Sequence, residues 1–218
     1  MFETLTAADG HEFHCWMQPA QGEARGGLVI LQEIFGVTDQ LKGVAQHYAA
    51  QGLNVAIPAL FDRQQRDAVI PFSAPAPGRD MMLAADLAQS MLDIDAAVSA
   101  LKARGGKVGV IGFCWGGGLA LRAAQVLDVA CAVSFYGTRL QGYLDRPLAH
   151  PMQGHFGLND DHTPPAVLDE VRARLPEFEM FLYEAGHAFC NDARPSYVPG
   201  AAALAHERAG AFLARHLA

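Results

Sequence analysis

The feature that most constrains this chain is a short glycine-flanked segment in mid-sequence, Gly112-Phe113-Cys114-Trp115-Gly116. It follows the apolar run 108–111, which predicts a buried strand, and it leads into a helix-compatible stretch over 117–127. A strand that turns into a helix within two or three residues forces strained backbone geometry on the residue at the apex, and flanking glycines avoid clashes there. Cys114 occupies that apex. The turn should lift its side chain out of the sheet towards the positive end of the following helix, where a thiolate is favoured.

Two other interpretations of this segment compete with a nucleophile. Free cysteine is among the most buried residue types, so Cys114 could be an ordinary core side chain at a strand end. A dinucleotide-binding turn also joins a strand to a helix, but the glycines at 109, 112, 116, 117 and 118 do not give G-x-G-x-x-G. A dinucleotide-binding turn would also be expected after the first strand, whereas this segment lies in the middle of the chain. The dinucleotide interpretation is therefore rejected, and the core interpretation stays open on the segment alone.

Length and charge limit the classes of function. The chain has 218 residues, 51% of them hydrophobic and 18% charged, which predicts a single α/β domain over 1–218. The formal net charge of −7 disfavours nucleic acid and anionic membranes as partners. Residues 1–12 show no leader pattern, and no apolar run approaches the roughly 18 residues of a membrane span, so a soluble cytoplasmic protein is expected. We expect a small-molecule partner and a monomer or small homo-oligomer.

The spacing of the cysteines does not indicate disulfide bonds or a metal site. The four of them, at 15, 114, 131 and 190, form no C-x-x-C pair and no zinc-binding spacing, so separate reduced thiols are expected. Cys131 lies in the apolar run 129–135 and is expected in the core.

Strand and helix patterns alternate along most of the chain. After a hairpin signal at Asp9-Gly10 within residues 2–17, apolar runs predict strands at 28–31, 53–57, 108–111, 129–135, 152–156 and 178–183. Helices are expected from a Thr38 cap to about 51, and at about 79–104, 115–127, 165–175 and 200–217. This alternation predicts a mostly parallel, doubly wound sheet with helices on both faces, and the mid-chain turn indicates an α/β-hydrolase fold. The irregular segment 58–78 is a candidate wall of a substrate site.

A cysteine nucleophile needs a base within hydrogen-bond reach and a third group that orients the base. In an open α/β sheet such groups lie just past the carboxyl ends of strands. Asp160 and Asp161 follow the strand 152–156, and His187 follows the strand 178–183, in the chain order nucleophile, acid, base of α/β-hydrolases. Most of the nine histidines will be surface or satisfied residues, and the two aspartates could form a turn or a helix start. The pattern leaves both aspartates open as the acid.

Glu33 follows the strand 28–31 in the segment Gln32-Glu33-Ile34-Phe35-Gly36. Strand-end glutamates are often simply solvated. A carboxylate near the thiol would either discourage its ionisation by charge repulsion or accept its proton, and both effects would gate the nucleophile. The backbone N–H groups of Ile34 and of Trp115, which directly follows Cys114, are the expected oxyanion donors.

Four ordered motifs together resemble the dienelactone hydrolase (carboxymethylenebutenolidase) family: 32–36, 112–117, the G-x-x-D-x-x-x-P pattern of 157–164, and Gly186-His187-Ala188-Phe189. The resemblance covers nearly the whole chain. It implies an α/β-hydrolase with a Cys114, His187, Asp160 triad, and it selects Asp160 over Asp161. It also implies that the resting cysteine is largely neutral and that substrate binding releases Glu33 to take the thiol proton. The implied reaction is hydrolysis of a cyclic enol ester in catechol degradation, without metal or cofactor.

The chain departs from that family in the groups that hold the substrate carboxylate. Members acting on dienelactone use arginines and a tyrosine, but the position four residues after His187 is Asn191, and Ala188 stands where a serine is found. Segment 58–80 offers no tyrosine. Candidate replacements are Arg63, Arg66, Arg79 and Arg194, although solvated loop arginines are an equally good interpretation. Without a bidentate clamp, the preference would move toward other esters.

The expected function is hydrolysis of small lactones or esters through a thiol ester, with dienelactone-type enol lactones as the first candidates. A general carboxylesterase is the alternative within the same class. An oxidisable thiol that senses redox state or binds a ligand is the alternative in another class, although an oriented base would have no use in such a sensor.

Overall fold

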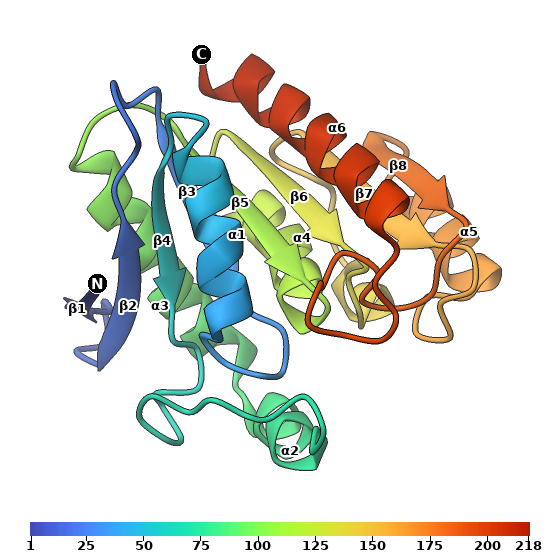
Figure 1. The fold of residues 1–218 in the computed structure, drawn as a ribbon, viewed down its shortest axis with the longest axis horizontal. Coiled ribbons are helices and arrows are strands. Elements are labelled where there is room, and N and C mark those ends of the chain that lie inside the picture. The colour runs from blue at the N-terminus through green and yellow to red at the C-terminus, as the bar shows by residue number, and fades with distance from the viewer. The chain divides into compact units, whose positions relative to one another are not determined.

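The computed structural model describes all of residues 1–218, in which three strands are followed by a largely alternating series of helices and strands (Figure 1). The strands are β1 (Phe2–Thr6), β2 (Glu12–Gln18), β3 (Gly27–Leu31), β4 (Asn54–Pro58), β5 (Val108–Phe113), β6 (Cys131–Phe135), β7 (Met152–Gly157) and β8 (Phe178–Tyr183). The helices are α1 (Asp39–Ala49), α2 (Ala76–Ala84), α3 (Leu87–Lys102), α4 (Trp115–Val126), α5 (Pro165–Arg174) and α6 (Pro199–Leu217), with a 3₁₀ turn at Leu140–Tyr143. The chain divides into two units, Met1–Gly109 with Leu217–Ala218, and Val110–His216. The single domain over 1–218 stays a prediction.

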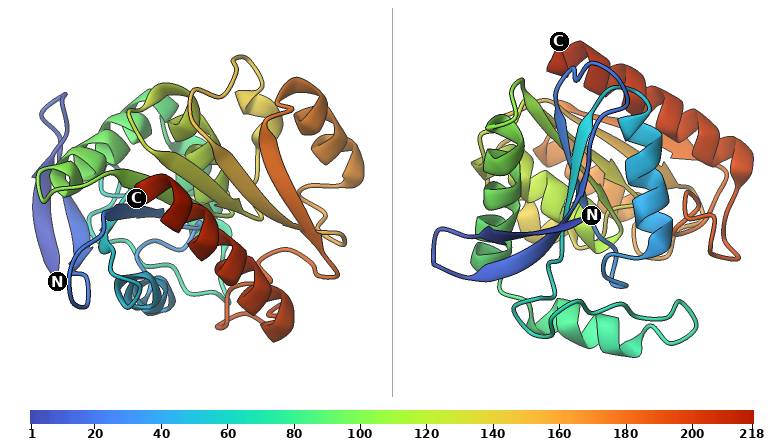
Figure 2. Two further views of the ribbon diagram at one scale, coloured as in Figure 1. Left: turned by 90° about the horizontal axis from the view of Figure 1, so that it is seen from above. Right: turned by 60° about the vertical axis from the view of Figure 1, so that its left-hand side comes forward.

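The first unit contains the strand order β1-β2-β4-β3. The predicted hairpin is confirmed: β1 pairs antiparallel with β2, and Gly10 in the turn has a positive φ of 86°. β2 pairs antiparallel with β4, and β4 pairs parallel with β3. All five residues of β3 are buried, as a continuous apolar run in a covered parallel strand predicts. Helices α1 and α3 cover opposite faces of β3 and β4 (Figures 1 and 2).

The helices of the first unit confirm one predicted cap and correct one predicted length. Thr38 caps α1, because its hydroxyl accepts the N–H of Leu41 at 3.2 Å. The single helix predicted at 79–104 is wrong, since α2 ends at Ala84 and α3 begins at Leu87. Ala85 takes an extended conformation, and the side chain of Asp86 accepts the N–H of Gln89 at 2.9 Å. This second cap starts a new helix.

The second unit contains the strand order β5-β6-β7-β8, with β6, β7 and β8 pairing in parallel. Phe135, His155 and Phe181 are register partners on β6, β7 and β8, and their ring centroids lie 4.9 Å and 5.7 Å apart in series. Helix α6 packs on this row of rings, with His206 at 4.8 Å from Phe135. Helix α4 contacts β6 from the other face (Figures 1 and 2). The predicted helices on both faces are found in each unit. The predicted parallel pairing is confirmed for β3 with β4 and for β6, β7 and β8, whereas β1 and β2 add two antiparallel pairings at the edge of the first unit.

None of the helices combines the length and the apolar character that crossing a membrane would need. Cys131 is fully buried in β6, which confirms its predicted place in the core.

Candidate active site

Cys114 lies at the sharp turn between β5 and α4, as the glycine-flanked segment predicts. Its φ of 53° and ψ of −117° are a strained combination for a residue with a side chain. A Cβ on Gly112 would overlap the carbonyl oxygen of Gly116, so the close turn requires glycine there. The backbone N–H of Cys114 donates to Phe135 at 3.0 Å, and its carbonyl accepts the N–H of Thr138 at 3.0 Å. These bonds hold the apex against the end of β6.

The surroundings of the four cysteines separate Cys114 from the others. Cys15, Cys131 and Cys190 are buried, whereas Cys114 is half-buried. Burial raises the pKa of Cys131 to about 12 and raises that of Cys15 further, so these two thiols stay neutral. The interpretation of Cys114 as a sealed core side chain is therefore wrong.

His187 and Asp160 meet in the loops that follow β8 and β7. His187 Nδ1 lies 2.8 Å from Asp160 Oδ2, and Asp160 Oδ1 accepts the backbone N–H of His162 at 2.8 Å. The side chain of Asp160 is fully buried and that of His187 is 21% exposed. Asp161 is exposed. The structure thus pairs His187 with Asp160, the aspartate that the family resemblance selects.

Backbone contacts between the two loops explain why this pair meets. The N–H of Asn159 donates to the carbonyl of Ala185 at 3.0 Å, and the N–H of Leu158 donates to that of Tyr183 at 2.8 Å. A Cβ on Gly157 would overlap the carbonyl oxygen of Ala185, so the loops approach each other over a glycine. The parallel ends of β7 and β8 are therefore tied together shortly before Asp160 and His187.

His187 also forms a side-chain hydrogen bond with Cys114, which completes a series from acid to imidazole to sulfur. Burial alone would lower the pKa of His187, but the hydrogen bonds to Asp160 and Cys114 and their negative charges outweigh burial and raise it to about 10. Burial would likewise raise the pKa of Asp160, yet the hydrogen bond from His187 lowers it overall. At neutral pH this is the arrangement of an imidazolium between two acidic groups.

Two rings that the sequence analysis missed contact His187. Tyr136, which directly follows β6, is buried and lies edge-on at 5.3 Å between ring centroids. His162 is exposed, and its ring centroid lies 4.4 Å from that of His187 with a tilt of 52°. His162 stands two residues after Asp160, so its place in the acid loop was the available sequence signal. The position of Tyr136 depends on tertiary packing.

The loop after His187 contains Asn191, at the position where the resemblance implies an arginine, and Arg194, whose predicted role in substrate binding stays a prediction. The Asn191 side chain is buried, and its Oδ1 accepts the N–H of Ala193 at 3.0 Å within the same turn. Ala188 is buried with a positive φ of 61°. Arg194 is half-buried, and its backbone N–H donates to the carbonyl of Asn191 at 3.0 Å. Asn191 therefore stabilises its own loop, and its predicted role as a substrate contact stays a prediction.

The arginines of the first unit differ in what they contact. Arg63 donates to both carboxylate oxygens of Asp93, at 2.8 and 2.7 Å, and to both of Asp9, at 2.8 and 3.1 Å. The hydrogen bond from Arg63 lowers the pKa of Asp9 to about 2. Four donor contacts leave Arg63 little capacity for a substrate carboxylate. This finding favours a structural role for Arg63.

Arg66 and Arg79 lie nearer to solvent. Arg66 is 47% exposed, and its Nη1 donates to the carbonyl of Glu12 at 3.0 Å. Arg79 lies exposed on α2. Their predicted roles in substrate binding stay predictions.

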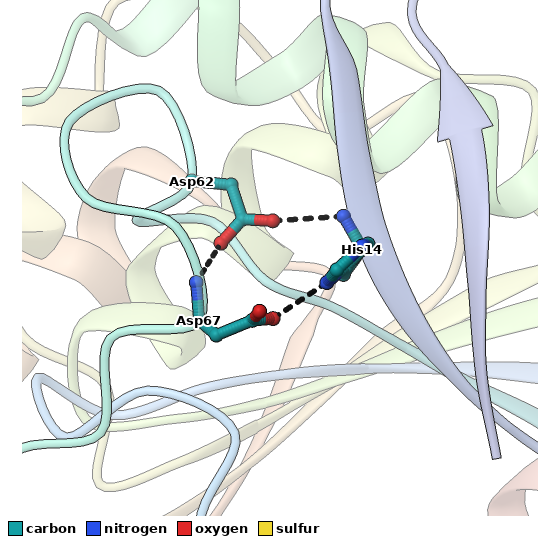
Figure 3. Close-up of side chains that lie close together, drawn as sticks. All are labelled: His14, Asp62 and Asp67. Carbon is teal, nitrogen blue, oxygen red and sulfur yellow. Dashed lines mark hydrogen bonds and ion pairs between the residues drawn. The ribbon is translucent and has the colours of Figure 1, made fainter.

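A second group of polar side chains, His14, Asp62 and Asp67, lies in the first unit (Figure 3). One nitrogen and two carboxylates could in principle hold a cation. However, the fully buried Asp62 already accepts the backbone N–H groups of His14 and Asp67, each at 2.8 Å, and His14 Nδ1 lies 2.6 Å from Asp67 Oδ1. These bonds tie the loop after β4 to β2, so the fold accounts for the cluster.

The sequence profile of the dienelactone hydrolase family matches residues 15–217, which include Cys114, Asp160 and His187. The chain belongs to the dienelactone hydrolase family. A carboxymethylenebutenolidase of Pseudomonas putida is 34% identical over 229 residues, which cover 97% of this chain and 94% of that relative. This family member is therefore a dienelactone hydrolase-like hydrolase.

Solved structures agree on the fold. A crystal structure from Klebsiella pneumoniae, provisionally named a dienelactone hydrolase, superposes with a TM-score of 0.84 at 25% identity and covers 99% of both chains. An esterase of Pyrococcus furiosus superposes with a TM-score of 0.74 at 17% identity, covering 100% of this chain and 93% of the esterase. The predicted α/β-hydrolase fold is confirmed.

Proposed function

We propose that this family member hydrolyses small lactones or esters through a Cys114–His187–Asp160 triad and a thiol-ester intermediate. The observation that carries the proposal is the unbroken hydrogen-bonded series from Asp160 through His187 to Cys114 within one unit. The relatives named carboxymethylenebutenolidase make dienelactone-type enol lactones the first substrates to test. In this proposal the enzyme works in the cytoplasm, where its thiols stay reduced.

The first half-reaction transfers the acyl group to sulfur. The Cys114 thiolate attacks the carbonyl carbon, a C–S bond forms, and the ester C–O bond breaks. The departing oxygen takes the proton from His187 Nε2, because Nδ1 is engaged by Asp160. In a lactone this oxygen remains attached to the acyl group. The imidazole is then neutral, and the sulfur is held in a thiol ester.

The second half-reaction releases the acid. His187 Nε2 accepts a proton from water while the water oxygen bonds to the acyl carbon, and the C–S bond then breaks. The thiolate leaves as the imidazolium forms, so Cys114 is released for the next substrate. The buried carboxylate of Asp160 stabilises the imidazolium and fixes Nδ1 as the protonated nitrogen throughout.

The oxyanion and gating roles rest on the sequence motifs around Glu33 and Cys114, and the family resemblance supports them. Trp115 is the first residue of α4, immediately after Cys114, and the first N–H groups of a helix point away from its own carbonyls. Ile34 and Glu33 belong to the first unit. Glu33→Gln should change the thiolate absorbance and lower turnover, whereas Glu23→Gln, an exposed glutamate of the same unit, should change neither. Equal behaviour of the two variants would remove Glu33 from the scheme.

A general carboxylesterase is the second candidate. It is favoured because the side chains of Asn191 and Arg63 already form hydrogen bonds within the protein. Without a bidentate clamp, a substrate carboxylate would gain little orientation at these positions. A panel of lactones and p-nitrophenyl esters, each with and without a carboxylate, separates the candidates. A preference for the carboxylated lactones supports dienelactone-type substrates, and a preference for neutral esters supports the carboxylesterase.

The triad itself is tested with Cys114→Ala, His187→Ala and the matched control His150→Ala. We expect turnover to fall by about 10³-fold or more in the first two variants and to stay near the wild-type rate in the third. Mass spectrometry should find one acyl group on Cys114 during turnover of a p-nitrophenyl ester. A wild-type protein that oxidises at Cys114 but turns over no ester would instead support the redox-sensing alternative.

A further inference from the structure

We propose that His162 is a positioning residue whose ring holds the imidazole of His187 in place after the thiol ester has formed. The inference rests on the proposed function and adds a residue to it. The His162 ring lies 4.4 Å from that of His187, at the exposed side of a base that is itself 21% exposed.

His162 acts on both members of the acid–base pair. Its backbone N–H donates to Asp160 Oδ1, while Asp160 Oδ2 is engaged by His187 Nδ1. The ring of His162 packs directly on the ring of His187. Since alanine and phenylalanine keep the backbone N–H, His162→Ala removes the ring contact and leaves the bond to Asp160 available.

The groups that hold the His187 ring in place change during the reaction. In the resting protein, His187 is held at Nδ1 by Asp160 and also by its hydrogen bond to Cys114. In the thiol ester the sulfur carries neither a proton nor a negative charge, so the hydrogen bond between His187 and Cys114 is lost. The imidazole is then kept in place by Asp160 and by its neighbouring rings, Tyr136 and His162.

Deacylation needs an accurately placed Nε2. This nitrogen must accept a proton from water as the water oxygen attacks the acyl carbon, and small misplacements of a reacting group cost large factors in rate. Acylation starts from the fully held imidazolium. Loss of the His162 ring should therefore slow deacylation more than acylation.

The experiment compares His162→Ala, His162→Phe and wild type with p-nitrophenyl acetate. Acylation is followed from the release of p-nitrophenolate, and deacylation from the decay of the acetyl-enzyme by mass spectrometry. We expect deacylation to fall about tenfold in His162→Ala, acylation to fall less than about threefold, and His162→Phe to recover most of the loss because a ring is restored.

Asp161→Ala is the matched control, because Asp161 is the exposed neighbour in the same loop. It should leave both rates near wild type. The proposal is overturned if deacylation in His162→Ala stays within about twofold of wild type, or if His162→Phe is as slow as His162→Ala. Absence of any acetyl-enzyme in the wild-type protein would instead count against the proposed function.

Discussion

At the residue scale, the charge on His187 results from opposing effects. Burial disfavours the imidazolium, whereas the hydrogen bonds and charges of Asp160 and Cys114 favour it and bring the pKa to about 10. The protonated imidazole is therefore the resting state over the whole neutral range. Its two neighbours contribute separately, so their removal should have separate and measurable effects.

We expect the pKa of His187 to fall in Cys114→Ala and also in Asp160→Asn, because each variant removes one hydrogen bond and one negative charge. The NMR shifts of the His187 ring protons and ring carbons, followed from roughly pH 5 to 11, measure this pKa. This pH range spans the ordinary and the raised pKa of the imidazole. His150→Ala is the control and should leave the His187 titration unchanged. A His187 titration identical in Cys114→Ala and wild type would contradict the sulfur contact.

Asn191 offers a second test at this scale. Asn191→Arg restores the family's residue type, but the site is 1% exposed and its amide closes a turn onto Ala193. We expect a loss of about 1–3 kcal/mol in the free energy of unfolding and no gain in preference for carboxylated lactones. Asp192→Arg, at the exposed neighbour, should cost little stability. A stable Asn191→Arg variant with a new carboxylate preference would show that the loop can present an arginine to substrate.

At the scale of elements, the close approach of α4 to the segment after β6 positions Cys114. The first turns of α4 contain Gly116, Gly117 and Gly118, all buried. A Cβ on Gly118 would overlap the carbonyl oxygen of Thr138 and lie 2.9 Å from the ring of Tyr143. Since Thr138 also donates its N–H to the carbonyl of Cys114, any displacement of α4 there would move the apex of the turn.

Gly118→Ala should therefore destabilise the protein by about 1–3 kcal/mol and lower turnover. The matched variant Gly200→Ala changes a helical glycine of α6 whose added Cβ meets nothing within 4 Å. It should stabilise the protein by about 0.5–1 kcal/mol, because alanine loses less conformational freedom in a helix. Chemical unfolding and ester hydrolysis measure both effects. Equal stability of the two variants would show that α4 does not need the close contact.

At the scale of the whole molecule, three titratable side chains make stability depend on pH. Burial lowers the pKa of His155 to about 3 from its usual 6.5, so only the unfolded chain binds this proton between those values. The pKa of Asp160 is lowered in the folded protein. Asp160 therefore contributes stability at any pH above its usual pKa of 3.8, and this stability is lost as the pH falls through its folded-state pKa. The pKa of His187 is raised. His187 therefore contributes stability at any pH below its usual pKa of 6.5, and this stability is lost as the pH rises through its folded-state pKa of about 10. The stability curve should therefore fall on both sides of neutrality.

We expect His155→Phe to flatten the acid side of that curve. The wild-type free energy of unfolding should decrease from pH 6.5 to 4 with a slope approaching about 1.4 kcal/mol per pH unit for this one proton. The variant keeps the stacking with Phe135 and Phe181 but loses the hydrogen bonds to Tyr183 and Gln153, so it should be less stable at pH 7. Phe181→Leu is the control, which should lower stability without changing the slope. An unchanged slope in His155→Phe would assign the acid sensitivity to other groups.

The predictable part of the molecule is the part encoded in local patterns. The order of strands and helices, the Thr38 cap and the sharp turn at Cys114 follow from apolar runs, cap residues and glycines that stand close together in sequence. The break between α2 and α3 was also encoded, because Asp86 followed by Gln89 is a helix-start pattern, but the longer helical stretch obscured it.

By itself, the sequence determined the family and the fold class, and it led to the hypothesis of a Cys114–His187–Asp160 triad, because each of these residues stands at a strand end within a recognisable motif. Only the tertiary structure decided which side chains surround them. The ring of His162 on His187, the engagement of Arg63 by Asp9 and Asp93, and the burial of Asn191 depend on contacts between folded segments. Such contacts depend on how side chains share space and hydrogen-bond donors after folding, which a one-dimensional pattern does not record.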